Sequence, residues 1–187
     1  MKRHAGDVAV LGVAAAIFLA QQLAISYMPL DGAAGAARRL LFLVTTIALA
    51  GLALHFRRFL GAWLVAAGIL LNVVPMTAHG GAMPIDYEIL ERSGAFPEVT
   101  EADIGRQTKH GKDVVLRRDD IRFFWLSDRY IVDLPIYGTN IYSLGDFVLF
   151  AGLGLIVLQA AFEALRPAPV PRPAADLPAD HAGGSER

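Results

Sequence analysis

Apolar and polar residues are separated into long blocks along this chain. Three apolar runs occupy residues 8–28, 40–56 and 59–76, and a fourth occupies residues 144–165. Each run has roughly 17–22 residues, the length that a helix needs to cross a hydrocarbon layer about 30 Å thick. Backbone groups in lipid must form hydrogen bonds within their own segment, so helices are the expected form. The pattern therefore predicts an all-α membrane protein with four transmembrane helices.

Most of the charged residues lie between the third and fourth runs, in residues 77–142. This polar block predicts one long extramembrane loop between helices three and four. Residues 166–187 contain many prolines and no large apolar cluster, which predicts a disordered tail. The expected organisation is a membrane domain of residues 1–165 followed by this tail.

The first run permits a second interpretation, as a cleaved signal peptide. Lys2 and Arg3 precede the apolar stretch, and residues 24–26 are a tolerable cleavage site. Small residues, however, recur at every fourth position and share one helix face, where a neighbouring backbone could approach closely. A retained span is therefore favoured by Gly12, Ala16, Ala20 and Ala24.

Basic residues near the span ends indicate the orientation, because cytoplasmic loops carry an excess of lysine and arginine. Four spans place both termini on one side, with Lys2, Arg3, Arg57, Arg58, Arg166 and Arg172. The other side holds fewer basic residues, namely Arg38, Arg39, Arg92 and Arg129. We therefore expect a multi-pass protein of the cell membrane with cytoplasmic termini, although the pair at 38–39 opposes this orientation.

Composition excludes several classes of function. The formal net charge is −1, so no nucleic-acid partner is expected. Cysteine is absent, which rules out disulfides, thiolate nucleophiles and cysteine-ligated metals. His110 and the acids near it show no recurring ligand spacing, so neither a metal nor a cofactor is expected. No span has a central charged residue, which disfavours a proton pump or an ion-coupled transporter.

A few polar residues lie within the spans. At least one of Gln21 and Gln22 should bond to a neighbouring helix, or the pair could line a polar pathway. Pro75 lacks an N–H group, so the third helix should kink or end there. Asn72 could then satisfy a freed backbone group or shape a pocket beneath the loop.

The loop begins with a predicted turn. Gly80 and Gly81 permit positive φ directly after a helix, and Pro84 extends the residue before it. We expect Met83 to pack on the edge of the bilayer. The alternative is a backbone nest that binds an anion or ligand, with His79 beside it.

The rest of the loop divides into a solvated insert and an aromatic segment. Residues 91–122 carry charges of both signs, and residues 113–116 could form a short strand. Residues 121–142 hold six aromatics and should lie along the membrane surface. Asp128 and Asp133 within it must be paired, solvated or protonated, and Arg129 is the nearest available partner.

The fourth span begins with a helix-capping pattern. Ser143 at the N-cap can accept a hydrogen bond from the N3 amide, and Asp146 at N3 can accept one from the N-cap amide. A role for Asp146 in a cavity near the interface is the alternative.

These pieces together resemble a bacterial membrane family of unknown function, family 5317. The resemblance covers about residues 60–158 and is carried by Leu71-Asn72, Gly80-Gly81, Met83-Pro84, Leu126, Asp128, Ser143, Gly145 and Asp146. His79 departs from the pattern, in which asparagine is expected before the glycines, and the insert at 96–119 is long. The resemblance implies a small multi-helix membrane protein and no known activity.

The leading hypothesis is a non-enzymatic accessory or scaffold subunit, with the lipid bilayer and either a second copy or another membrane protein as partners. One alternative is a translocation component lined by Gln21, Gln22, Asn72, Asp128 and Asp146. Another is an interfacial enzyme using His79, Asp128 and Asp146 as acid–base groups. Any site is expected where residues 79–84 meet residues 128–146.

Overall fold

Four long helices dominate the computed structural model, which describes residues 2–108, 111–135 and 138–165. They are α1 (Lys2–Tyr27), α2 (Gly32–Ala53), α3 (Leu60–Ala78) and α5 (Leu144–Leu165). All four are long and apolar enough to cross a membrane. The four predicted helices are thereby confirmed, and the chain is compatible with a multi-pass membrane protein. The tail predicted at 166–187 lies outside the described residues.

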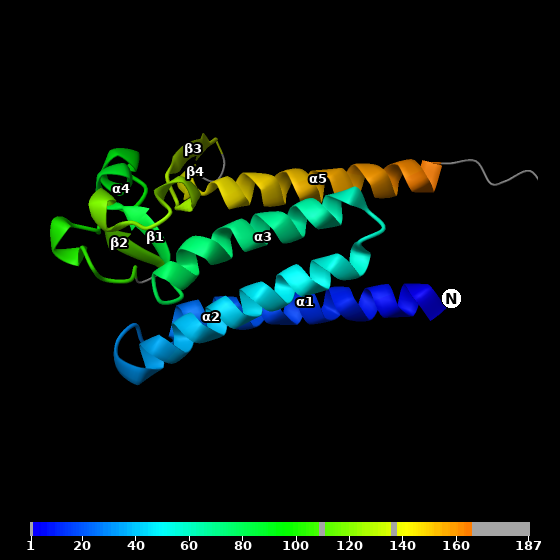
Figure 1. Cartoon of the computed structure of the whole chain (residues 1–187), viewed down its shortest axis with the longest axis horizontal. Helices are drawn as coiled ribbons and strands as arrows, with labels where there is room; N and C mark the ends of the chain where they lie inside the picture. Colours follow the sequence, from blue (N-terminus) through cyan, green and yellow to red (C-terminus); the bar gives the residue numbers. More distant parts are fainter. Residues whose placement is uncertain (1, 109–110, 136–137, 166–187) are drawn as a thin grey trace, which may run out of the picture.

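The helices form an open row, in which α1 packs on α2, α2 on α3, and α3 on α5 (Figure 1). Among the described residues, the other pairings of these helices make few contacts or none. Along the helix axes, the N-terminus and the C-terminal end of α5 lie at the same end of the helices. The segment between α3 and α5 lies at the opposite end of the helices.

Glycines hold α3 and α5 together as an antiparallel pair. Gly61 and Gly68 on α3 face Gly152 and Gly145 on α5, and all four are buried. A Cβ atom at Gly61 would overlap the carbonyl oxygen of Gly152, and one at Gly68 would overlap backbone atoms of Leu149. Two helical turns separate the glycines on each helix, so both backbones remain close along this length.

The contact between α1 and α2 depends on polar side chains instead. Gln21 is buried, and its Nε2 donates to the hydroxyls of Thr45 at 2.8 Å and Thr46 at 3.2 Å. Near the other end of α1, Asp7 accepts a hydrogen bond from Arg58 at 3.2 Å and lies 3.2 Å from His55 Nε2. The prediction that one of the two glutamines bonds a neighbouring helix is confirmed for Gln21.

Most of the small-residue face of α1 is exposed. Ala24 is buried, but Gly12, Ala16 and Ala20 are exposed, and no atom lies within 4 Å of a Cβ built at Gly12. The helix turns its Gln21 face toward α2 because that face can form hydrogen bonds there. Gln22 is exposed as well.

The segment between α3 and α5 contains strands, which corrects the all-α prediction. A parallel pair is formed by β1 (Met83–Asp86) and β2 (Asp113–Leu116), and an antiparallel pair by β3 (Tyr130–Leu134) and β4 (Gly138–Tyr142). The strand expected at 113–116 is confirmed. The remaining short elements are α4 (Tyr87–Ser93), η1 (Leu54–Phe56), η2 (Glu101–Asp103), η3 (Arg118–Asp120) and η4 (Phe124–Leu126).

Strand β1 is the centre of this segment, since all its residues are buried. Its Ile85 packs with Leu90 and Val115 in a small apolar core. On the side away from β2, the Asp128 N–H donates to the Pro84 carbonyl at 3.3 Å. Asp128 follows β1 by more than 40 residues of chain. Because β1 pairs on both sides, it brings the start of β2 close to Asp128.

Candidate polar site beside the start of α5

The predicted turn after α3 is present. Helix α3 continues through Pro75 to Ala78, and Gly80 and Gly81 then take φ values of 65° and 92°. The Gly81 N–H donates to the Met76 carbonyl at 2.8 Å, so this amide completes the helix end. A Cβ at Gly81 would lie 2.8 Å from the Arg39 carbonyl oxygen, so only glycine permits this close approach to α2.

Met83 is buried inside the folded segment, whereas the sequence predicts that it packs on the edge of the bilayer. Met83 and Pro84 are both fully buried within β1. The Met83 N–H donates to the Lys112 carbonyl at 3.0 Å, so the residue belongs to the strand pair. The apolar side chain therefore serves the core of the segment rather than a membrane surface.

His79 is held by backbone atoms. Its Nδ1 lies 2.7 Å from the Pro75 carbonyl, and its Nε2 accepts from the Arg122 N–H at 3.2 Å. These two contacts fit a ring in which Nδ1 donates and Nε2 accepts. The histidine thus joins the end of α3 to the chain near residue 122.

Asn72, Ser143 and Asp146 form a closed network between α3 and α5. Asn72 Nδ2 donates to Asp146 Oδ1 at 2.8 Å, and Asn72 Oδ1 accepts from the Ser143 hydroxyl at 2.7 Å. The Ser143 N–H donates to Asp146 Oδ2 at 2.9 Å, and the Asp146 N–H to Ser143 Oγ at 3.0 Å. The predicted capping pattern is present, and it also fixes Asn72.

Asp128 pairs with Lys112, not with Arg129. Lys112 Nζ lies 3.1 Å from Asp128 Oδ2 and 3.8 Å from Asp113 Oδ1. The Arg129 guanidinium instead stacks over the rings of Trp125 at 4.2 Å and Phe124. Lys112 could not be identified from the sequence because it lies in the charged insert, and only the pairing of β1 with β2 brings it to Asp128.

Burial raises the pKa of Asp128 to about 8, an effect that Asp113 and Asp146 increase and Lys112 partly offsets. Burial by itself disfavours the charged form of Lys112. The three carboxylates outweigh that effect and raise the pKa of Lys112 above its usual value. Burial thus favours the protonated form of Asp128, and the neighbouring carboxyl groups favour the charged form of Lys112.

A cavity of about 270 Å³ opens beside these groups. Its charged lining comes from the start of β2, from Asp128 and from the first turn of α5, with Lys112, Asp113, Asp128 and Asp146. Uncharged groups complete the wall, including Asn140, Phe96, Tyr142 and Phe150. The structure thus brings Asp128 and Asp146 together, as expected, and places Asn72 directly behind Asp146.

Asp133 lies apart from this cavity. It is an exposed residue of β3, and its Oδ1 accepts from Thr139 at 3.3 Å. Of the other predicted site residues, His79, Gly80 and Gly81 belong to the turn after α3. Within the described ranges, no three metal-ligating side chains are grouped so as to hold a metal ion.

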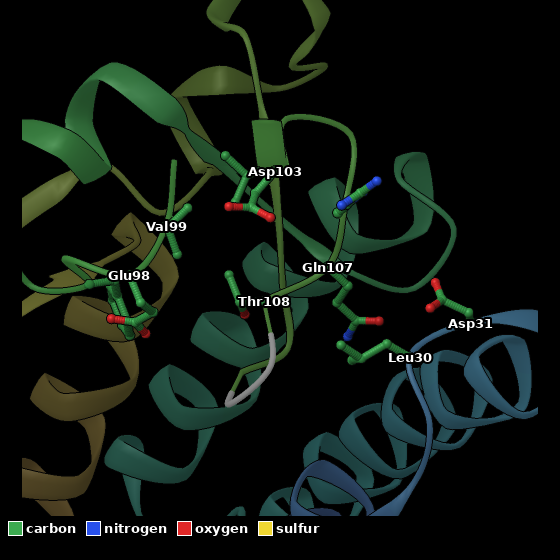
Figure 2. Close-up of a pocket in the computed structure, with 10 residues that line it drawn as sticks. Leu30, Asp31, Glu98, Val99, Asp103, Gln107 and Thr108 are labelled. Carbon is green, nitrogen blue, oxygen red and sulfur yellow. The ribbon is translucent and has the colours of Figure 1, made fainter. Parts of the chain in front are cut away.

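A second cavity, of about 480 Å³, lies between the α1–α2 connection and the insert (Figure 2). Leu30 and Asp31 border one side of it, and Glu98, Val99 and Asp103 another. Gln107 and Thr108 also line it, and none of the predicted site residues does. Apart from Leu30 and Asp31, its lining residues lie in the insert at 96–119, whose length departs from the family pattern.

No curated protein and no solved structure matches the chain. Its sequence does match a family of unknown function (DUF5317) over residues 7–158. The match runs from near the start of α1 into α5 and includes the whole candidate site. The chain therefore belongs to the DUF5317 family, which confirms the resemblance seen in its sequence.

Proposed function

We propose that this protein is a non-enzymatic accessory or scaffold subunit of a membrane complex. The observation that supports this most is the outward face of α1, where Gly12, Ala16 and Ala20 are exposed. In lipid there is no hydrophobic driving force that brings apolar side chains together. Helices therefore associate through small residues that let their backbones approach closely. In this chain small residues join α3 to α5 in this way, whereas the small residues of α1 face away from the other helices.

Gln22 adds a second reason to expect a partner helix. It is exposed within the apolar part of α1, while Gln21 next to it is buried and bonded. A glutamine amide in hydrocarbon gains roughly 0.6–2 kcal/mol from a hydrogen bond to a neighbouring helix. A partner that carries a small-residue face and a polar group at this depth fits α1.

The polar groups near the cavity support a non-enzymatic role. The ring of His79 is bonded to backbone atoms on both sides, and Asn72 and Ser143 use Asp146 as an acceptor. These bonds stabilise the fold and already occupy His79 and Asp146, two of the three groups that an interfacial enzyme would use. The translocation alternative has less support, because Gln21 bonds α2 whereas Asn72 and Asp146 join α3 to α5.

We also propose that the segment between α3 and α5 lies outside the cell membrane, with both termini cytoplasmic. The excess of basic residues near the span ends on the side of the termini supports this. Arg38 Nη2 donates to the Gly111 carbonyl at 2.8 Å. That bond ties the polar segment to α2 at the level of its arginine pair. In intact cells, an impermeant maleimide should label Glu98→Cys, whereas Arg57→Cys should react only after lysis; the reverse would invert the orientation.

Co-purification in mild detergent tests the subunit proposal. Wild-type protein should retain a partner, and Ala16→Leu should lose it while the chain itself remains folded. The matched control is Val157→Leu, an apolar substitution at an exposed position of α5. If wild type purifies without any partner, or if both variants behave alike, the proposal is wrong.

A further inference from the structure

The cavity beside the start of α5 has an excess of negative charge. Its lining contains one lysine and three aspartates, Asp113, Asp128 and Asp146. Lys112 already contacts Asp128 and Asp113, and Asp146 accepts from Asn72 and the Ser143 N–H. When all four groups are charged, a cation is the ligand that reduces the imbalance.

Two acceptor atoms in this wall are buried without a hydrogen bond. Among the described residues, no donor reaches Asp128 Oδ1 or Asp113 Oδ1, although Lys112 Nζ lies 3.8 Å from the latter. Asp128 is only 4% exposed, so bulk water does not compensate for the missing bond. A ligand with several N–H donors would satisfy acceptors of this kind.

Aromatic rings form the side of the cavity next to α5. The rings of Tyr142 and Phe150 pack edge to face with centroids 5.8 Å apart. Phe150 is a half-exposed residue of an apolar helix, so the cavity reaches the surface that would meet lipid. Aromatic faces and carboxylates together suit an ammonium ion, which gains from both.

We propose that this cavity binds a primary ammonium group, supplied either by a lipid headgroup or by a small soluble amine. This site is independent of the α1 surface, since it lies at the far side of the helix row from α1. The cavity volume of about 270 Å³ suits a small group rather than a large ligand. A quaternary ammonium fits less well, because it has no N–H to donate to the two free acceptors.

The same site makes binding depend on pH. Lys112, Asp113 and Asp146 face Asp128 from β2 and α5, and burial keeps the pKa of Asp128 near 8. A bound cation favours the ionised carboxyl, so binding should release a proton from Asp128. Affinity should therefore rise as the pH increases from 6 toward 8.

Two binding experiments on the full chain separate the sources. Calorimetry in detergent measures ethanolamine, with choline as the quaternary control, and native mass spectrometry of protein from mixed vesicles compares retained phosphatidylethanolamine with phosphatidylcholine. Preference for ethanolamine alone assigns a soluble amine, and preference for phosphatidylethanolamine assigns a lipid. No preference in either experiment overturns the proposal.

Variants test whether binding occurs in this cavity. Asp128→Asn and Asp113→Asn should each weaken binding roughly ten-fold or more, because each removes a charged acceptor. Asp133→Asn is the matched control, as it removes an exposed aspartate of the same segment outside the cavity. Because two cavity positions are substituted separately, misfolding of one variant does not decide the result. Circular dichroism checks that each variant is folded. Equal loss in all three variants would place the site elsewhere.

Discussion

The pair α3–α5 and the pair α1–α2 are built in different ways. Four buried glycines bring the backbones of α3 and α5 together, whereas α1 meets α2 through Gln21 and two threonines. The first pair is closed and supports the polar site at its end. The second leaves most of α1 exposed, including its own small residues. The same small-residue pattern therefore packs two helices together in one place and remains exposed in the other.

The largest expected effect breaks the α3–α5 pair. Gly68→Leu places a side chain against backbone atoms of Leu149 and Gly145, which cannot move without separating the helices. We expect a loss of about 3 kcal/mol of unfolding free energy, measured by thermal unfolding in detergent. Gly154→Leu is the control, since no atom lies within 4 Å of a Cβ there. Equal stability of the two variants would contradict the glycine contact.

A smaller loss is expected when the network at the top of this pair is opened. Asn72→Ala leaves the buried Ser143 hydroxyl without its acceptor and removes one bond to Asp146. The unfolding free energy should fall by about 1–3 kcal/mol. Thr77→Ala, whose hydroxyl bonds only its own helix, should change it little. An Asn72→Ala protein as stable as wild type would show that the network contributes nothing.

The pH dependence of stability should come from the α3–α5 end of the molecule. The folded pKa of Asp128 lies above its unfolded value, so folding favours the protonated carboxyl. That contribution is complete at low pH and is lost as the pH rises toward 8, with a slope below about 1.4 kcal/mol per pH unit. Asp128→Asn should flatten this slope in denaturation measurements between pH 5 and 8. An unchanged slope would mean that the carboxyl does not titrate there.

The smallest expected loss of stability distinguishes Gln21 from its neighbour Gln22 on α1. Gln21→Leu removes the bonds to Thr45 and Thr46 and should cost roughly 0.6–2 kcal/mol. Gln22→Leu should leave the isolated chain as stable as wild type, because Gln22 is exposed, but should weaken partner retention. Unfolding of the isolated chain and co-purification measure the two effects. The reverse pattern would mean that the face of α1 is misassigned.

Hydropathy predicted the four helices because lipid demands long apolar segments. The boundary of α2 was wrong: the helix begins at Gly32 rather than near residue 40, since Arg38 is buried inside it against Gly111. In a sequence, an arginine usually indicates the end of a membrane span. Here the folded insert covers Arg38, so the helix continues past it. The capping bonds of Ser143 and Asp146 were predictable because they join residues three apart.

The Lys112–Asp128 pair was not predictable from sequence spacing. It depends on β1 pairing with β2 on one side and with Asp128 on the other, and these pairings join distant parts of the chain. Arg129 was the expected partner because it is adjacent, yet its guanidinium stacks on aromatic rings. The site expected between the two flanks of the loop therefore needs a residue of the insert as well.

Cross-linking along α1 tests most directly the claim that this helix presents a docking surface. The chain has no cysteine, so single substitutions report without background. In native membranes, Gly12→Cys and Ala16→Cys should cross-link to a partner, whereas Val157→Cys on α5 should not. Cross-linking that is absent from α1, or equally strong at position 157, would contradict the account.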